Sequence, residues 1–227
     1  MTRTLGVVMD SIESINPYKD TTLLLLLAAQ NRGWEIMYMQ QHDLSLENEN
    51  PVASMSQLRV KDHQTDWFSL GQPKLTSLSD LNVILMRKDP PFDTEYIYTT
   101  YILEAAEKLG VMVLNKPQSL RGCNEKIFAA SFPQCTPPLL VSRDVGQIKN
   151  FYKKHHDIVL KPLDGMGGAS IFKIGKNDLN LNVIIETLTD NGRRTIMAQK
   201  FIPEIKLGDK RILMIEGEPV PYCLARI

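Results

Sequence analysis

The sequence predicts an N-terminal α/β domain with a parallel, Rossmann-like sheet, followed by a largely antiparallel α+β region. Three observations carry this prediction. A strand, a helix and a second strand fill some forty residues at the start of the chain, which is the pattern of a βαβ unit. Buried apolar runs then alternate with capped helices up to about residue 120. Beyond about residue 155, short strands separated by turns replace this alternation.

The first βαβ unit is set by apolar runs and by the residues at the ends of its helix. Asp20 is positioned to cap a helix over residues 21–32, and Gly33 is positioned to end it. Continuous apolar runs predict buried strands on both sides of this helix and further along the chain, at 5–9, 35–39, 83–86 and 111–114.

A second helix of the N-terminal domain precedes the last of these strands. Asp93 or Thr94 caps it, and Gly110 stops it. Residues 52–60 and 67–70 have a weaker pattern, which indicates a hairpin or an excursion at the edge of the sheet.

The second half of the chain begins with a helix that Asn124 is positioned to cap, running from Glu125 to about Phe132. Prolines then mark a connector, at positions 133, 137 and 138. Further helices are expected at 144–155 and 180–188. Short strands are expected at 158–160, 170–174, 195–199, 211–215 and 219–224.

Composition and charge limit the classes of function. The 227 residues contain 26 Lys and Arg and 26 Asp and Glu, so the formal net charge is zero, which argues against nucleic acid as a partner. The apolar run at 23–29 is too short to span a membrane, and no signal peptide is recognisable, so we expect a cytoplasmic protein. The three cysteines form no C-x-x-C pair, which indicates reduced thiols rather than disulfides or a zinc site.

The segment Ile158–Ser170 carries the strongest chemical signal. Its first three residues predict a short buried strand, with Lys161 at its end. Gly165, Gly167 and Gly168 permit positive φ and a close approach of the backbone to a ligand. A lysine beside a glycine-rich turn is typical of a polyphosphate site, which needs a point charge and converging amide N–H groups. The alternative is a β-hairpin turn with an exposed lysine.

Two further segments fit a nucleotide. Lys126 is expected in the first turn of a helix, where the helix dipole disfavours a cation, so this lysine is more useful to a bound anion. A surface lysine is the alternative. The strand near 197–200 runs into a linker that Pro203 ends, where exposed backbone groups can pair with an adenine edge and Phe201 and Ile202 can flank its ring. The alternative is an ordinary exit from a strand into a loop.

Arginines near strand ends indicate anion sites. Arg87 follows a buried strand in M-R-K-D-P-P-F-D, where two prolines stiffen the loop. Arg87 can grip a carboxylate, or it can pair with Asp89 or Asp93 in a salt-bridged loop. Arg211 and Arg226 stand on paired strands, where they either face one anion or act as solvated edge charges.

Five segments together resemble the bacterial glutathione synthetase family of ATP-grasp ligases. They are L-G-V-V-M-D, L-M-R-K-D-P-P-F-D-T-E-Y-I-Y, N-K-P-Q-S-L-R-G-C-N-E-K, V-L-K-P-L-D-G-M-G-G-A-S-I-F and G-D-K-R-I-L-M-I-E-G-E-P-V-P-Y-C-L-A-R-I. They occur in order and cover the chain from end to end. The resemblance implies an N-terminal α/β substrate-binding domain at 1–122, a first ATP-grasp lobe at 123–203, and the start of a second lobe at 204–227.

The resemblance also implies an activity. The family joins γ-glutamylcysteine to glycine with ATP and Mg²⁺, for which Mn²⁺ is an alternative. The dipeptide carboxylate is phosphorylated first, and the amine of glycine then attacks the acyl phosphate. The resemblance also implies a cytoplasmic homo-oligomer, a homotetramer. The expected partners are small molecules, with no nucleic acid and no membrane.

Residue roles follow from the same resemblance. Lys126 and Lys161 resemble the two lysines that hold ATP phosphates. The small loop over the phosphates is matched by Gly165, Met166, Gly167 and Gly168, and the adenine hinge by Gln199, Lys200, Phe201 and Ile202. Asp209 matches a nucleotide contact, and the expected catalytic residues, which contact the phosphoryl group or the substrate carboxylate, are Arg211 and Arg226. The dipeptide is expected near Arg87 and Asp89.

The family chain continues beyond Ile227 through a glycine-rich loop and a late acidic and Asn-containing segment that binds Mg²⁺. We therefore expect an incomplete second lobe, metal ligands only beyond Ile227, and little ligase activity if the polypeptide ends there. Two alternatives stay open. One is a nucleotide-binding module without catalysis, and the other is an ATP-grasp ligase for a different carboxylate and amine.

Overall fold

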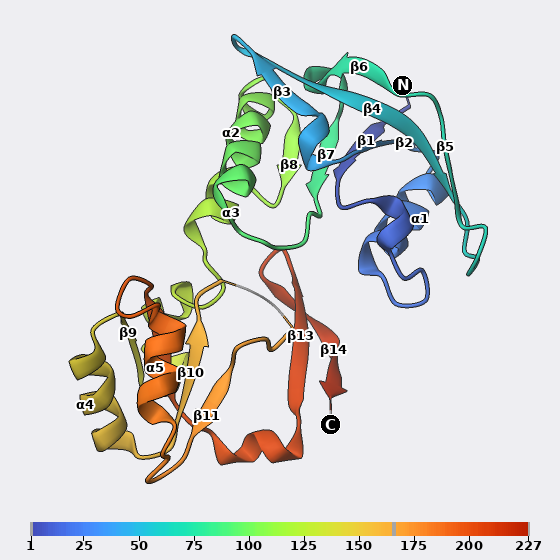
Figure 1. Cartoon of the computed structure of the whole chain (residues 1–227). Helices are drawn as coiled ribbons and strands as arrows, with labels where there is room; N and C mark the ends of the chain where they lie inside the picture. Colours follow the sequence, from blue (N-terminus) through green and yellow to red (C-terminus); the bar gives the residue numbers. More distant parts are fainter. Residues whose placement is uncertain (1, 165–166, 227) are drawn as a thin grey trace. The chain divides into compact units, whose positions relative to one another are not determined.

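The computed structural model describes residues 2–164 and 167–226, which belong to two compact units (Figure 1). Unit 1 comprises residues 1–124 and 164–166, and unit 2 comprises residues 125–163 and 167–227. Each unit has its own hydrophobic core. Gly165 and Met166, expected in the phosphate loop, lie outside the described residues.

Unit 1 is built on an eight-stranded mixed sheet whose centre is parallel. The main path of the sheet has the order β3-β4-β2-β1-β7-β8. The parallel strands are the four that the apolar runs predict: β1 (Thr4–Val8), β2 (Glu35–Met39), β7 (Val83–Met86) and β8 (Met112–Leu114). The predicted α/β class with a parallel central sheet is therefore confirmed.

An antiparallel extension completes the sheet of unit 1. β4 (Asn50–Val60) pairs with β2, and three short strands pair with β4: β3 (Leu44–Glu47), β5 (Phe68–Leu70) and β6 (Lys74–Ser77). The expected hairpin is the β4–β5 pair. β3 and β6 were not predicted, because they are short and mostly exposed and so have no apolar run.

Two helices pack on opposite faces of the parallel strands. Leu26 of α1 (Thr21–Asn31) shares a core with Val7, whereas Leu103 of α2 (Thr94–Lys108) shares a separate core with the next strand residue, Val8. Alternate residues of β1 therefore serve the two faces.

The predicted caps of both helices are confirmed. The side chain of Asp20 accepts the backbone N–H of Leu23, and the side chain of Asp93 accepts that of Tyr96. Gly33 and Gly110 follow the two helices with φ of +77° and +96°. These are left-handed conformations that glycine adopts without steric cost.

Unit 2 contains a four-stranded antiparallel sheet in the order β11-β10-β12-β9. Its strands are β9 (Leu139–Ser142), β10 (Ile158–Pro162), β11 (Phe172–Ile174) and β12 (Ile196–Lys200). Helices α4 (Val145–His155) and α5 (Leu181–Thr189) cover one face through Ile148 and Ile185, which pack with Leu160 of the sheet. A two-stranded ribbon of β13 (Asp209–Ile215) and β14 (Glu218–Arg226) follows.

The helix predicted from Glu125 to about Phe132 is wrong. Helix α3 (Pro117–Gly122) lies upstream, because proline at the first helical position has a suitable φ and needs no amide donor there. Residues 125–127 form a turn, and a 3-10 turn covers Phe128–Ser131. Pro133 disfavours helical geometry at Phe132, whose φ and ψ are −124° and 67°. Lys126 is therefore not in the first turn of a helix, and the dipole argument for it fails.

Two other details of unit 2 differ from expectation. Residues 139–142, for which no element was predicted, form β9, because the neighbouring prolines hide a short edge strand in the sequence. Pro162 is the last residue of β10 and lies opposite Ile196. Lys161 is therefore inside the end of the strand, and its side-chain direction is fixed by the sheet.

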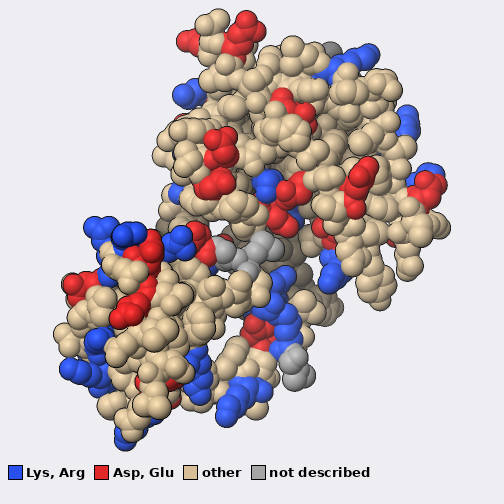
Figure 2. Space-filling model, in the orientation of Figure 1, with Lys and Arg blue, Asp and Glu red and all other residues tan. Residues whose placement is uncertain are grey.

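Charged side chains of both signs lie on the face in view. Figure 2 shows Lys and Arg side chains interspersed there with Asp and Glu, as a formal net charge of zero suggests. Among the helices in the described part of the chain, none is both long and apolar enough to cross a membrane.

Candidate functional site

The alternation of β10 places Lys161 on the face of its sheet that the helices leave open. Ile158 and Leu160 point into the core under α4 and α5, so Val159 and Lys161 point the other way. Val159 lies opposite Gln199 of β12. The ammonium of Lys161 donates to Gln199 Oε1 at 2.9 Å, so the two predicted site residues are brought together.

The ammonium of Lys126 is close enough to Lys161 for its charge to affect the pKa of Lys161. Burial lowers the pKa of Lys161 below its ordinary value of 10.5, and the positive charge of Lys126 lowers that pKa further. The Lys126 side chain is only 13% exposed and pairs with Glu125 Oε1 at 2.7 Å. Its ammonium also lies 3.4 Å from the carbonyl oxygen of Leu163.

Two half-buried lysines that repel each other are suited to hold an anion between them. Each ammonium carries three N–H donors, and Lys161 has a neutral amide oxygen from Gln199 rather than a carboxylate as its hydrogen-bond acceptor. A bound polyanion would replace the mutual repulsion by attraction. The pair is therefore suited to phosphate groups.

The glycine turn after β10 has the backbone freedom that was predicted for it. Gly167 and Gly168 have φ of +72° and +78°, and a Cβ at either position would meet nothing within 4 Å. The left-handed φ therefore explains why glycine stands at these positions. Lack of room for a side chain does not, because a Cβ would meet no neighbouring atom.

The predicted hinge begins where β12 ends. Lys200 donates its backbone N–H to the carbonyl of Pro138 at 2.9 Å, and Phe201 donates its N–H to the carbonyl of Asp157 at 3.0 Å. These two donors are thus not free for a nucleobase, contrary to the simplest form of the prediction. The ring of Phe201 lies 4.1 Å below the ammonium of Lys173, a cation–π contact.

A cavity of about 420 Å³ adjoins this hinge. Its lining is rich in cationic side chains and consists of His155, Asp157, Lys173, Lys200, Phe201, Pro203 and Lys206. The volume is within the usual range for small-molecule sites.

The β13–β14 ribbon brings Asp209, Arg211 and Arg226 to one face. Asp209 lies directly opposite Arg226, and Arg211 follows two residues along β13. The guanidinium of Arg226 donates from both Nε and Nη2 to the carboxylate of Asp209. This hydrogen bonding and the charges of Arg226 and Arg211 hold the pKa of Asp209 below its ordinary value of 3.8. In the part of the chain that the structure describes, Asp209 is the anion on which both arginines act.

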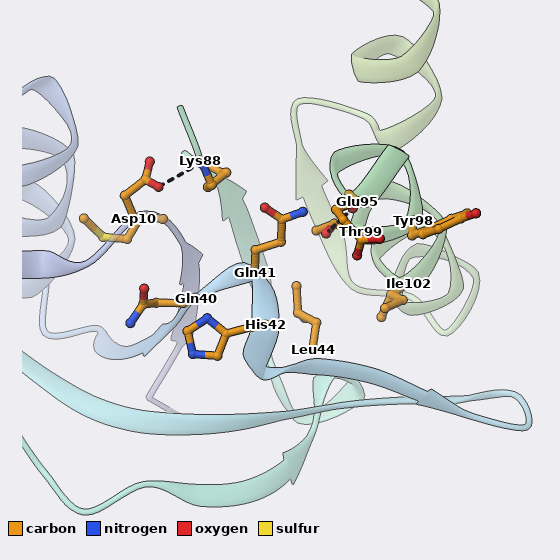
Figure 3. Close-up of a pocket in the computed structure, with 11 residues that line it drawn as sticks. Asp10, Gln40, Gln41, His42, Leu44, Lys88, Glu95, Tyr98, Thr99 and Ile102 are labelled. Carbon is orange, nitrogen blue, oxygen red and sulfur yellow. Dashed lines mark hydrogen bonds and ion pairs between the residues drawn. The ribbon is translucent and has the colours of Figure 1, made fainter. Parts of the chain in front are cut away.

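Unit 1 contains a second candidate site, at the carboxyl ends of β1, β2 and β7. Strands β2 and β7 lie on either side of β1, so this is the switch point where ligands bind in open α/β sheets. A pocket of about 540 Å³ lies there, lined by Met9, Asp10, Gln40, Gln41, His42, Leu44, Lys88, Glu95, Tyr98, Thr99 and Ile102. Figure 3 shows Asp10 and Lys88 on one side of it, the α2 residues on the other, and Gln41 between them.

Asp10 joins the end of β1 to the loop that follows β7. Its Oδ1 lies 2.8 Å from the ammonium of Lys88, and its Oδ2 accepts the backbone N–H of Asp89 at 3.0 Å. Lys88 in turn donates to the carbonyl of Asp89 at 2.6 Å. The M-R-K-D loop is therefore held, as its prolines suggest, but by a three-residue ring of contacts that the sequence did not predict.

Arg87 does not form the salt-bridged loop that was one of its two expected arrangements. Its Nε donates to Thr22 Oγ1 at 3.0 Å, in the first turn of α1. Among the described residues it forms no ion pair with Asp89 or Asp93. Lys88 lines the pocket instead; its place after a buried strand was evident from the sequence, but no binding role was predicted for it.

Comparison with known proteins identifies the family. The model of the prokaryotic glutathione synthetase N-terminal domain matches residues 4–121, and that of the prokaryotic glutathione synthetase ATP-grasp domain matches residues 125–227. The chain belongs to the prokaryotic glutathione synthetase family. Glutathione synthetase of Yersinia pestis is 59% identical over 98% of this chain and 70% of its own length. That of Escherichia coli O157:H7 is 57% identical over 98% of this chain and 71% of its own length.

Solved structures show the same fold at low identity. D-alanyl-alanine synthetase A from Vibrio cholerae has a TM-score of 0.60 at 12% identity, covering all of this chain and 69% of its own. A RimK domain ATP-grasp protein from Sphaerobacter thermophilus has a TM-score of 0.61 at 17% identity, covering 92% of this chain and 68% of its own. The chain thus spans about 70% of the length of its curated relatives, and its family indicates an ATP-dependent carboxylate–amine ligase.

Proposed function

We propose that this chain serves the ATP-dependent ligation of γ-glutamylcysteine to glycine, which forms glutathione through an acyl phosphate. The position of the Lys161 ammonium carries the proposal: Gln199 Oε1 holds it at 2.9 Å, and the charge of Lys126 acts on it, and phosphoryl transfer depends on cations positioned around the transferred group. The family assignment supports the choice of substrates.

Two covalent steps make up the reaction. An oxygen of the dipeptide carboxylate attacks the γ-phosphorus of ATP, and ADP leaves. The amine of glycine then attacks the acyl carbon, inorganic phosphate leaves, and the amine loses a proton. The acyl phosphate is hydrolysed if water reaches it, so a loop that covers the site has a chemical purpose.

We assign the nucleotide to unit 2. Lys126 and Lys161 bind the phosphates, and Gly167 and Gly168 belong to the loop that contacts them. The hinge at 199–202 binds the adenine. Lys161 is held in place by Gln199, so the two parts of this nucleotide site are linked by one hydrogen bond.

Three residues of the ribbon are assigned to the phosphoryl group and the carboxylate. Arg211 and Arg226 contribute guanidinium charge, and Asp209 contacts the nucleotide. In the structure the Arg226 guanidinium donates two hydrogen bonds to the carboxylate of Asp209. A substrate phosphate or carboxylate offers the same bidentate geometry and can exchange with Asp209.

We assign the dipeptide to unit 1, near Arg87 and Asp89. The pocket at the switch point is wide enough for a dipeptide and carries charges of both signs, from Lys88, Asp10 and Glu95. Opposite charges suit a zwitterionic substrate.

Mg²⁺, or Mn²⁺ in its place, is proposed as the metal cofactor of the reaction. When bound, such an ion neutralises phosphate charge. Within the part of the chain that the structure describes, no group of three or more His, Cys, Asp and Glu side chains is arranged to hold a metal. The residues described here therefore do not fit a metal site, and we assign no step to the metal.

Three broader features complete the proposal. The domain bounds are placed at 1–122, 123–203 and 204–227. The protein is proposed to be cytoplasmic and to form a homotetramer. Its partners are the small-molecule substrates γ-glutamylcysteine and glycine.

The test is ATP turnover by the chain, measured with γ-glutamylcysteine and glycine added together and separately. Turnover that requires both substrates supports the proposal. A rise in melting temperature with ATP but no turnover would favour a nucleotide-binding module without catalysis. Turnover only with a different acid and amine would favour another ATP-grasp ligase.

A further inference from the structure

A proline lies opposite the first residue of the nucleotide hinge. The register of β9 and β12 pairs Gln199 with Leu139, and one step further sets Lys200 opposite Pro138. Lys200 donates its N–H to the Pro138 carbonyl at 2.9 Å. In an antiparallel ladder, two residues paired in this way exchange two hydrogen bonds. Pro138 has no N–H to return, so this pair lacks the hydrogen bond that would otherwise reach the carbonyl of Lys200.

The next hydrogen-bonding group on the same edge is also open. Backbone groups alternate along an extended chain, so Phe201 turns to the other edge and donates to Asp157. Ile202 is extended, with φ and ψ of −105° and 107°, and returns to the edge of Lys200. Its N–H has no partner among the residues that the structure describes. A carbonyl acceptor and an N–H donor, two residues apart, are thus left side by side.

This acceptor–donor pair has the polarity of an adenine partner. Adenine presents its N6 amino donor next to its N1 acceptor, which the Lys200 carbonyl and the Ile202 N–H can satisfy together. A 6-oxopurine such as hypoxanthine or guanine presents an O6 acceptor next to an N1–H donor. That edge would set two acceptors against each other and two donors against each other, and unpaired polar groups in a site are costly.

We propose that Pro138 is a positioning residue that keeps the Lys200 carbonyl open and thereby selects adenine over 6-oxopurines. The inference rests on the nucleotide role proposed for the hinge. Any other residue at this position would supply an N–H aimed at the Lys200 carbonyl. That N–H would compete with the N6 amino group of ATP for the same acceptor.

Pro137 provides a matched control in the same segment. Its place one residue earlier turns its missing N–H away from β12, toward the outer edge of β9. β9 is an edge strand, since the sheet order is β11-β10-β12-β9. Pro137→Ala therefore changes the chain stiffness in the same way as Pro138→Ala, but it adds no donor facing the hinge.

The experiment measures the dissociation constants of ATP and ITP for the 227-residue chain and both variants by isothermal titration calorimetry. We expect the unmodified chain and Pro137→Ala to prefer ATP. Pro138→Ala should lower the ATP-to-ITP preference by about tenfold, the ratio that one hydrogen bond commonly provides. Hydrogen exchange should show the new amide at position 138 protected in the free chain. This protection is a direct sign of pairing that a loss of general stability would not produce.

Several outcomes would overturn the inference. The first is an ATP-to-ITP ratio that is the same in all three proteins, and the second is an unmodified chain that does not distinguish the two nucleotides. In either case ATP binding itself leaves the proposed function standing. A chain that binds no ATP contradicts both. If Pro138→Ala melts at a lower temperature than Pro137→Ala, Pro138→Gly supplies the same N–H, and an unchanged ratio in that variant also counts against the inference.

Discussion

The ammonium of Lys161 lies 2.9 Å from the side-chain oxygen of Gln199, across two neighbouring antiparallel strands. The two residues are 38 positions apart in the chain. Their contact ties the lysine that we propose as a phosphate ligand to the strand that leads into the proposed hinge. Because a neutral oxygen accepts this hydrogen bond, the positive charge of Lys161 stays available to a nucleotide.

The first prediction concerns Lys161 itself. Lys161→Ala should lower the ligation rate by roughly a hundredfold or more, since removal of one preorganised charge contact typically costs about 2.7–4 kcal/mol of barrier. Glutathione formation in a coupled ADP-release assay measures the effect. Lys153→Ala, on the last turns of α4, removes the same charge elsewhere and should leave the rate unchanged. Near-normal turnover in Lys161→Ala would refute the assignment.

A second prediction follows from the lowered pKa of Lys161. Burial and the Lys126 charge disfavour the protonated form, so phosphate binding should raise the pKa again. ATP binding should therefore take up protons at alkaline pH, between the lowered pKa of the free chain and the raised pKa of the complex. Calorimetry in buffers of different ionisation enthalpy measures this uptake. Lys126→Gln should raise the pKa of Lys161 and reduce the uptake, and an unchanged uptake in that variant would contradict the coupling.

The same shift has a consequence for stability. In the pH range between the lowered pKa of folded Lys161 and its ordinary value of 10.5, the unfolded chain binds more protons than the folded one. The contribution of this group to the free energy of unfolding should therefore rise with pH across that range. Lys126→Gln should make this rise smaller.

The sequence predicted those parts of the fold that local chemistry decides. The caps at Asp20 and Asp93 and the glycines after both helices are short-range features, and the structure has all of them. The parallel strands also followed from their apolar runs. The helix expected after Asn124 does not form. A helix begins upstream at Pro117 instead, and Pro133 disfavours helical geometry just before it, so a single capping residue was not enough.

The candidate site was predictable in part. Lys161 and Gln199 were singled out separately, but only the β10–β12 register brings them together. The ring formed by Asp10, Lys88 and Asp89 depends on strand order, which places the end of β1 beside the end of β7. Strand order is a long-range property that a single sequence does not reveal. The open Lys200 carbonyl required the β9 register in the same way.

The third prediction tests the ring at the switch point. Asp10→Asn should lower the free energy of unfolding by about 1–3 kcal/mol, because the Lys88 side chain is only 14% exposed and would lose its charged partner. The amide of Asp89 should exchange faster with solvent. Urea unfolding and hydrogen exchange measure the two effects. Asp62→Asn, in an exposed loop, is the control, and an Asp89 amide that stays equally protected would contradict the role of Asp10.

The fourth prediction concerns the Asp209–Arg226 pair. Arg226→Gln should raise the pKa of Asp209 toward its ordinary value of 3.8, because the hydrogen bonds from Arg226 are the largest cause of the lowered value. Arg211→Gln should raise it less, since Arg211 acts only through its charge. Carboxyl ¹³C chemical shifts against pH measure both. With the pKa lowered in the fold, this pair contributes stability above the unfolded pKa of Asp209 and loses it as the pH falls through the folded pKa. An order reversed between the two variants would contradict the geometry.

The last prediction tests how closely the centre of the unit 1 sheet is packed. A Cβ at Gly6 in β1 would lie 2.6 Å from Leu81 Cδ1 and 2.8 Å from Met39 Cε, closer than such atoms normally approach. Both neighbours are buried core side chains and can move only by disturbing the packing around them. Gly6→Ala should therefore lower the free energy of unfolding by about 1–3 kcal/mol, the usual cost of overpacking. Gly122→Ala, at the end of α3, meets nothing within 4 Å and should be neutral or slightly stabilising. Urea unfolding measures the free energy of unfolding of both variants. If the two values change equally, β1 has room for a methyl group and the centre of the sheet is not close-packed.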